Sequence, residues 1–276
     1  MATQKSLYIK LPLVLALILI FNYAHSQSVS TLMGARANGM GYTSAALFDS
    51  WSIFNNIAGA AKIEEHSAGF AYDLRPALPG GNRAAAALAL PTSIGVISGG
   101  VFRFGDNLYN EGVLSAGFSN QFGLAALGVK INYIQYNAEG FGRSGVVSIG
   151  FGGIAEITQQ LSVGAYITNI NQPKISKDGD RIPTLLTAGL SFKPGKNVII
   201  ATEIEKDLDA KANWKTGVEY SFHKKFCART GYNLEPNTIF FGLGFKTTKL
   251  AIDYAIQHTV QLNLSHQTSV NYFFTR

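Results

Sequence analysis

The chain has 276 residues, of which 14% are charged and 47% hydrophobic, and it carries a formal net charge of +6 at pH 7. About 25% of the residues of a soluble domain are charged, so this composition is unusual for one. The charge is spread along the chain, which argues against a nucleic-acid partner, and the single cysteine, Cys227, excludes an internal disulfide.

Residues 1–26 have the pattern of an export signal. Lys5 and Lys10 form a basic start, an apolar run covers residues 11–21, and Ala24-His25-Ser26 is a small-residue cleavage site. We expect a cleaved signal peptide and a mature chain that begins at Gln27. The alternative is an uncleaved inner-membrane anchor, which would need an apolar run of about 20 residues.

The segment 34–46, GARANGMGYTSAA, is dense in glycine and suggests a phosphate-binding loop. Met40 and Gly41 stand where a P-loop needs Lys and then Ser or Thr. The dinucleotide-binding fingerprint fails as well, because Ser44 occupies the place of its third glycine. We therefore expect neither nucleotide nor phosphate to bind here.

Most of the remaining chain alternates between large apolar residues and small or polar ones. In residues 239–246, for example, Ile239, Phe241 and Leu243 share one face with Phe245, and the other face includes Gly242. The second face is mostly Gly, Ala and Ser, whereas the solvent face of a soluble β-sandwich is usually rich in Lys, Glu and Thr. This favours a transmembrane barrel whose apolar face meets lipid. Gly-to-Ser changes on the inner face should then cost little.

We count fourteen candidate strands. They span residues 64–73, 82–90, 94–104, 108–119, 122–136, 143–154, 160–170, 183–192, 196–205, 212–222, 225–233, 237–246, 248–257 and 262–274. The even-numbered connections are tight, and the odd-numbered ones, such as those after the first, fifth and seventh strands, tend to be longer. Outer-membrane barrels sort short periplasmic turns and longer outer loops in this way. The sequence thus predicts an all-β, transmembrane antiparallel β-barrel of about 14 strands over residues 64–276.

Residues 27–63 lack alternation and are rich in small residues, so we expect them to form a plug inside the barrel. A fourteen-stranded barrel leaves a lumen that its own side chains do not fill. An N-terminal cap under the barrel mouth is the alternative. Arg36 would be a costly buried charge unless paired, and its candidate partners are Asp49, Glu203, Glu219 and Asp253.

Two motifs carry a resemblance to a known family. The plug motif consists of Gly34, Ala35, Arg36, Gly39, Met40, Gly41, Asp49, Asn56, Ala58 and Gly59. The loop motif consists of Asn169, Pro173, Lys174 and Pro183. With the closing hairpin, these stretches resemble the FadL-like outer-membrane proteins, in particular the PorV/PorQ branch associated with type IX protein secretion. Ile57 departs from the proline that this branch has at that position.

Chemistry-bearing patterns are sparse, and we expect no catalytic residues, no cofactor and no metal. There is no Gly-x-Ser-x-Gly elbow and no cluster with metal-ligand spacing. A serine across a strand from His266 could mimic an outer-membrane lipase, an alternative that only geometry can test.

Two non-enzymatic functions follow from the resemblance. The nearer one implies an accessory component of type IX secretion, with secretion-system proteins or secreted cargo as partners. The wider family implies a transporter or channel for hydrophobic small molecules. Both place the chain in the outer membrane of a Gram-negative-type bacterium, in contact with its lipids, and neither involves nucleic acid or nucleotide.

Overall fold

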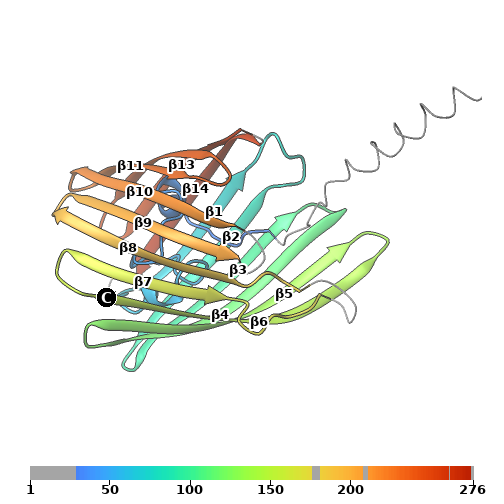
Figure 1. Ribbon diagram of the computed structural model, residues 1–276, viewed down its shortest axis with the longest axis horizontal. Coiled ribbons are helices and arrows are strands. Elements are labelled where there is room, and N and C mark those ends of the chain that lie inside the picture. Colours follow the sequence, from blue (N-terminus) through green and yellow to red (C-terminus); the bar gives the residue numbers. More distant parts are fainter. Residues whose placement is uncertain (1–28, 176–180, 208–210, 261, 275–276) are drawn as a thin grey trace, which may run out of the picture.

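The computed structural model describes residues 29–175, 181–207, 211–260 and 262–274 (Figure 1). The predicted signal peptide, residues 1–26, lies outside these residues. Fourteen antiparallel strands follow one another around a single closed barrel, and β1 pairs with β14 to complete it. The prediction of an all-β barrel of about 14 strands is confirmed.

The barrel strands are β1 (His66–Leu74), β2 (Arg83–Thr92), β3 (Gly95–Gly105), β4 (Tyr109–Phe122), β5 (Ala125–Ala138), β6 (Gly142–Glu156), β7 (Leu161–Thr168), β8 (Leu185–Gly195), β9 (Val198–Asp207), β10 (Ala212–His223), β11 (Phe226–Asn233), β12 (Thr238–Lys246), β13 (Leu250–Thr259) and β14 (Asn263–Phe274). In the described part of the chain before β1 lie two short helices, α2 (Ala35–Gly39) and the 3-10 helix η1 (Ile57–Ala60). None of the helices in the described part of the chain is long and apolar enough to cross a membrane.

The closing seam is fully paired, from His66 opposite Phe274 to Leu74 opposite His266. Closure at this seam removes the two free edges that an open sheet would offer to another chain. The same seam brings the start of β1 and the end of β14 to one end of the barrel. We call this the turn end, and the opposite end, which holds the β1–β2 and β7–β8 connections, the loop end.

The connections follow the predicted sorting only in part. At the turn end all are tight, such as 93–94 between β2 and β3 and 224–225 between β10 and β11. At the loop end 75–82 and 169–184 are long, but 139–141 is a tight turn. The longer loop expected after the fifth strand is wrong, because ladder pairing continues to Ala138 opposite Gly142 and absorbs most of that segment into β5 and β6.

The alternation separates an apolar exterior from a filled interior. On β12, Ile239, Phe241 and Leu243 are 44%, 59% and 61% exposed, whereas Phe240 between them is 1% exposed. Similar exposed aliphatic and aromatic side chains surround the whole barrel. Soluble monomers rarely expose apolar patches of this extent, whereas a barrel in a bilayer requires them.

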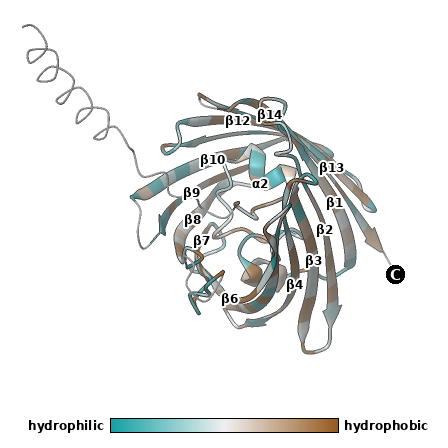
Figure 2. Cartoon of the chain, turned by 90° about the vertical axis from the view of Figure 1, so that its right-hand side faces the viewer, coloured by the Kyte–Doolittle hydropathy of each residue, from teal (hydrophilic) through white to brown (hydrophobic). Residues whose placement is uncertain are grey.

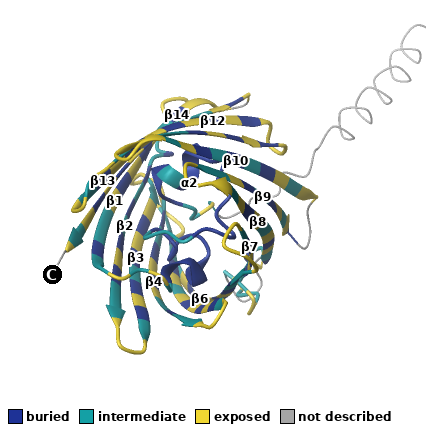
Figure 3. Cartoon of the chain, turned by 90° about the vertical axis from the view of Figure 1, so that its left-hand side faces the viewer, coloured by how far each residue is buried: buried dark blue, intermediate teal, exposed yellow. Residues whose placement is uncertain are grey.

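The interior is occupied by residues 29–63, which we call the plug. Figures 2 and 3 look into the barrel from opposite sides, and both show this segment within the ring of strands. The plug begins toward the loop end, where the Val29 amide donates to the Glu111 carboxylate and an Arg83 nitrogen donates to the Ser30 carbonyl oxygen. It ends at the turn end, where Lys62 pairs with Glu156.

Candidate functional site in the plugged lumen

The plug meets the barrel wall through glycines that leave no room for a side chain. A Cβ on Gly217 would overlap the carbonyl oxygen of Met40, and one on Gly231 would overlap the amide nitrogen of Gly41. A Cβ on Gly242 would lie 3.0 Å from the Cα of Gly39. The small inner face is therefore the complement of the plug backbone. The expectation that Gly-to-Ser changes there cost little is wrong at these positions, because the plug already fills the space.

Within the plug, the motif glycines allow tight backbone turns. Gly34 has φ of 104°, a left-handed conformation that side chains rarely adopt, and a Cβ there would lie 2.7 Å from Cγ of Trp51. The Trp51 amide donates to Asp49 Oδ1 at 2.8 Å. The Asp49 amide donates in turn to the carbonyl oxygen of Gly59 at 3.2 Å. The two halves of the plug motif thus close on each other.

Asn56 holds the turn between the two halves of the plug. Its side-chain oxygen accepts from the Ala58 amide at 3.1 Å, as an N-cap does. Its side-chain nitrogen donates to the Ala45 carbonyl oxygen at 2.6 Å and to the Gly153 carbonyl oxygen of β6 at 3.2 Å. The remaining motif residues Ala35, Met40 and Ala58 are fully buried.

An ionic network of Arg36, Asp49, Glu219, Arg229 and Asp253 binds the plug to the wall. Arg36 Nη1 lies 2.9 Å from Asp49 Oδ2, and its Nε and Nη2 donate to the Glu219 carboxylate at 2.9 and 3.0 Å. Arg229 Nε donates to Glu219 at 2.6 Å, and its Nη1 donates to Asp253 at 2.7 Å. The Glu219 charge holds the pKa of Arg36 well above its usual value. Two of the four predicted partners, Asp49 and Glu219, therefore pair with Arg36.

The other two candidate acids have different partners. Asp253 belongs to the network through Arg229. Glu203 accepts from the Ala45 amide of the plug at 3.0 Å and lies 3.5 Å from Lys215 Nζ. Glu203 thus also holds the plug, but through its backbone rather than through Arg36.

A cavity of about 1010 Å³ opens at the turn end, below the ionic network. Arg36, Glu219 and Arg229 line it, together with residues of the β10–β11 and β12–β13 turns. Cys227 also lines it and is half-buried, with its Sγ 3.0 Å from an Arg229 nitrogen. The lining of this cavity combines charged side chains with aromatic ones such as Phe48 and Phe273.

On the opposite wall, toward the loop end, the lumen is apolar. We call the buried side chains here the apolar cluster. Its members are Met33, Trp51, Ile53, Phe54, Ile57, Ala71, Ala85, Ala87, Phe102, Val113, Ile134, Tyr136, Val146 and Ile182. Most of the wall residues come from β2 to β6, and Ile182 comes from the β7–β8 connection. Figure 2 shows that the plug crosses the lumen beside these strands.

Three buried charges interrupt this wall in the described residues, and two of them, Arg83 on β2 and Glu111 on β4, hold the start of the plug. The third, Lys130 on β5, is 4% exposed, and its Nζ donates to the carbonyl oxygens of Ile53 at 2.9 Å and Asn55 at 3.2 Å. It therefore binds the plug through neutral acceptors, whereas Glu219 on the other wall binds the plug through the charge of Arg36.

The loop motif closes the β7–β8 connection over the apolar cluster. Asn169, with φ of 58°, donates from its side chain to the Pro183 carbonyl oxygen at 2.7 Å. The Ile182 amide donates to the Pro173 carbonyl oxygen at 2.9 Å, and Lys174 forms an isolated bridge with Arg181. The four motif residues thus lie together at the base of the loop, and they hold Ile182 in the cluster.

The barrel ladder is shortest beside this loop. β6 pairs with β7 only from Phe151 to Glu156, although β6 begins at Gly142. Beyond the ladder the loop takes over, since the Ile170 amide donates to the Ile149 carbonyl oxygen and Asn171 bonds to the backbone of β6. A loop segment, rather than a strand, therefore covers this part of the wall.

Neither alternative chemistry assembles in the described residues. His266 faces outward, its Nδ1 lies 2.7 Å from the Tyr254 hydroxyl, and its cross-strand neighbours are Leu74 and Ile256 rather than a serine. Across the part of the chain that the structure describes, no group of three His, Cys, Asp or Glu side chains could hold a metal ion.

No family model matches the sequence, and no curated protein matches it. Solved structures do match. The monoaromatic hydrocarbon channel CymD has a TM-score of 0.70 at 12% identity, over 91% of this chain and 100% of that chain. The toluene transporter TbuX of Ralstonia pickettii has 0.67 at 12% identity, over 89% and 99%. A FadL homologue of Pseudomonas aeruginosa has 0.61 at 12% identity, over 90% and 100%.

The chain has the fold of FadL-like channels and transporters. At 12% identity this similarity concerns the fold alone. None of these names refers to type IX secretion, so the PorV/PorQ part of the resemblance stays a prediction.

The apolar cluster and the role of Lys130 were not predicted from the sequence. A signal existed on β5, where Ile131 and Tyr133 face outward and Ile134 and Tyr136 face inward. Large apolar residues on both faces of one strand indicate that the inner face also meets apolar material.

Proposed function

We propose that this chain is an outer-membrane channel that carries small hydrophobic molecules toward the periplasm. This is the second of the two functions that the sequence predicts. The apolar exterior supports the membrane location, because it would be unstable in water. The tight turns at the turn end support an orientation with that end in the periplasm and the loop end outside.

The observation that carries the proposal is the apolar cluster inside the lumen. The interior of a membrane barrel is usually polar. Here Phe102, Val113 and Ile134 face inward and are 4%, 7% and 6% exposed. An apolar lining of this kind lowers the free energy of a hydrophobic solute in the lumen relative to water. A protein that only docks partners at its surface has no need of it.

The loop and the ladder break supply a place of entry. The cluster lies under the β7–β8 connection, which Ile182 anchors. It also lies beside the first part of β6, where no strand of the described chain pairs with β6 on the side of β7. Movement of one loop would expose the cluster without breaking a strand ladder. The names of the structural neighbours, which include channels and transporters of monoaromatic hydrocarbons, agree with a solute of this class.

Toluene uptake by cells whose own outer membrane excludes it tests this function. The wild-type chain should raise the uptake rate, and Val113→Asn should abolish most of the increase, because it puts an amide into the apolar cluster. Thr187→Asn on β8 is the matched control, since it changes an inward, buried residue that lies outside the cluster. Equal uptake by the two variants would contradict the proposal, as would uptake that does not depend on the wild-type chain.

A further inference from the structure

Three neighbouring turns at the turn end carry a set of lysines that we call the lysine rim. Each turn, together with the strand end before it, contributes two of them, and none of the turns contains an acid. The members are Lys193 near the end of β8 and Lys196 in the turn to β9, Lys224 and Lys225 between β10 and β11, and Lys246 at the end of β12 and Lys249 in the turn to β13. Antiparallel neighbours bring these turns side by side, so that six positive charges lie on one arc of the barrel.

These ammonium groups are available to a partner. Lys196, Lys224, Lys225, Lys246 and Lys249 are exposed, and Lys193 is half-buried. Among the described residues, none of the ion pairs involves a lysine of the rim. Lys246 Nζ lies 5.6 Å from the centre of the Phe273 ring, and Lys224, Lys225 and Lys246 stand at the mouth of the turn-end cavity, whose lining they share with Phe273.

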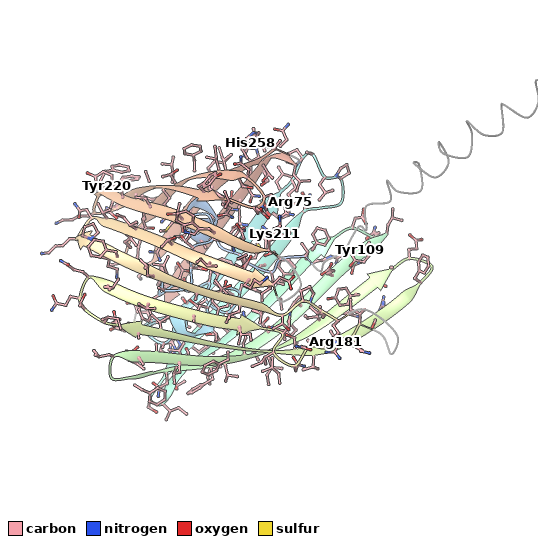
Figure 4. All side chains as sticks on the ribbon, viewed as in Figure 1. Arg75, Tyr109, Arg181, Lys211, Tyr220 and His258 are labelled. Carbon is pink, nitrogen blue, oxygen red and sulfur yellow. The ribbon has the colours of Figure 1, made fainter. Side chains whose placement is uncertain are left out.

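Aromatic rings next to the rim mark its depth in a bilayer. Phe222 and Phe226 stack with centroids 6.2 Å apart, and Phe226 lies 5.1 Å from Phe245. Tyr220, which is 51% exposed, lies at the same end of the barrel (Figure 4). Aromatic girdles lie at the membrane–water interface, so the lysines just beyond this one extend to the level of the lipid phosphates.

The other three turns at the turn end expose apolar side chains instead of lysines. The turns β2–β3, β4–β5 and β6–β7 present Ile94, Leu124 and Ile157, which are 69%, 70% and 57% exposed. None of these three turns contains a lysine, and Glu156 beside the last one is paired with Lys62. Positive charge is therefore concentrated on one arc of the turn end. If the lysines served only to keep the turns soluble, they would be spread evenly over all six turns.

We propose that the lysine rim binds the phosphate groups of anionic phospholipids in the periplasmic leaflet. The inference rests on the proposed outer-membrane location and orientation. Clustered lysines at the headgroup level attract anionic lipids, and each adds to the attraction. Paired lysines on adjacent turns suit a lipid phosphate better than a free anion, because the acyl chains can lie along the aromatic residues of β10 to β12 below.

The test uses the full chain in nanodiscs made from equal amounts of phosphatidylglycerol and phosphatidylcholine, followed by native mass spectrometry of the lipids that stay bound. The wild-type chain should retain phosphatidylglycerol preferentially. The combined variant Lys196→Gln, Lys225→Gln and Lys249→Gln should lower that preference on the order of tenfold. High salt should weaken the preference in the wild type, because these charges are exposed.

A matched control removes three exposed charges at the loop end, with Arg143→Gln, Lys174→Gln and Lys211→Gln, and should keep the preference. Figure 4 shows Lys211 at the far end from Tyr220. Equal loss in both variants, or no preference in the wild type, would overturn the proposal. So would displacement of the lipid by inorganic phosphate at constant ionic strength. Heat-modifiable migration in gels reports membrane insertion separately, so a chain that inserts but does not select phosphatidylglycerol contradicts only this inference.

Discussion

The plug meets two walls that hold it by different physics. On the side of α2, β10 to β13 contribute Glu219, Arg229 and Asp253, which form buried ion pairs with one another and with Arg36. On the side of η1, β2 to β6 contribute mainly apolar side chains, with Arg83, Glu111 and Lys130 as charged exceptions. We call these the charged wall and the apolar wall.

The difference assigns a separate role to each wall. Buried ion pairs have strict geometry, and losing one partner leaves an uncompensated charge, so the charged wall fixes the position of the plug. Apolar contacts are non-directional and can be exchanged for contacts with another apolar molecule. The apolar wall can therefore release part of its contacts to a hydrophobic solute while the charged wall keeps the plug in place.

Removal of the plug, which contacts both walls, should have the largest effect. Deletion of residues 34–59 should turn a filled lumen into an open pore, so single-channel conductance in planar bilayers should rise strongly over the wild type. Glycine contacts such as those of Gly217 and Gly231 show how closely the plug fills the space. Unchanged conductance from a deletion variant that still folds would mean that the plug does not occlude the pore.

Breaking the charged wall should be among the most costly point changes. Glu219→Leu removes the carboxylate shared by Arg36 and Arg229, and we expect a loss of about 3 kcal/mol in the free energy of unfolding. Denaturant unfolding of the protein refolded in vesicles measures it. Glu156→Ala breaks the exposed pair with Lys62 and should cost less than about 1 kcal/mol. Similar losses in both variants would remove the distinction between the network and an ordinary surface pair.

On their lipid-facing sides, the two walls should be equally sensitive to an added charge. Leu243 on β12 and Leu114 on β4 are 61% and 59% exposed on the exterior. Leu243→Arg and Leu114→Arg should each cost about 2–4 kcal/mol near the middle of the membrane, because both put a charge into lipid. The same vesicle unfolding experiment measures both. A low cost in either variant would show that its strand does not face lipid.

The glycine contacts should have smaller effects than the changes of charge in the lumen and in lipid. Gly231→Ala would press a methyl group against the Gly41 backbone and should cost about 1–3 kcal/mol. Gly117→Ala on the apolar wall meets only the ends of the Ile57 and Ile53 side chains, at 2.7 and 3.0 Å, which can rotate away, so its cost should be lower. Thermal unfolding of the two variants compares them. The reverse order would mean that the apolar wall holds the plug more rigidly than the charged wall.

Part of the candidate site could be read from the sequence. Arg36 stood out because an arginine in an apolar segment needs an acid, and two of the four acids considered prove to be its partners. Arg229 and the apolar cluster were missed, because their roles depend on which strands face each other across the lumen. Sequence alternation shows that a residue points inward, but not what it meets there.

The sequence by itself determined the number of strands and which face of each points outward, because period-two alternation and tight turns are local properties of the chain. The tertiary structure alone decided which side chains share a wall. Barrel closure places β10, β11 and β13 around Arg36 and brings β2 to β6 together with Ile182 from a distant loop. The same closure gathers three lysine-bearing turns into one arc. These groupings depend on contacts between residues far apart in the chain, which no local pattern specifies.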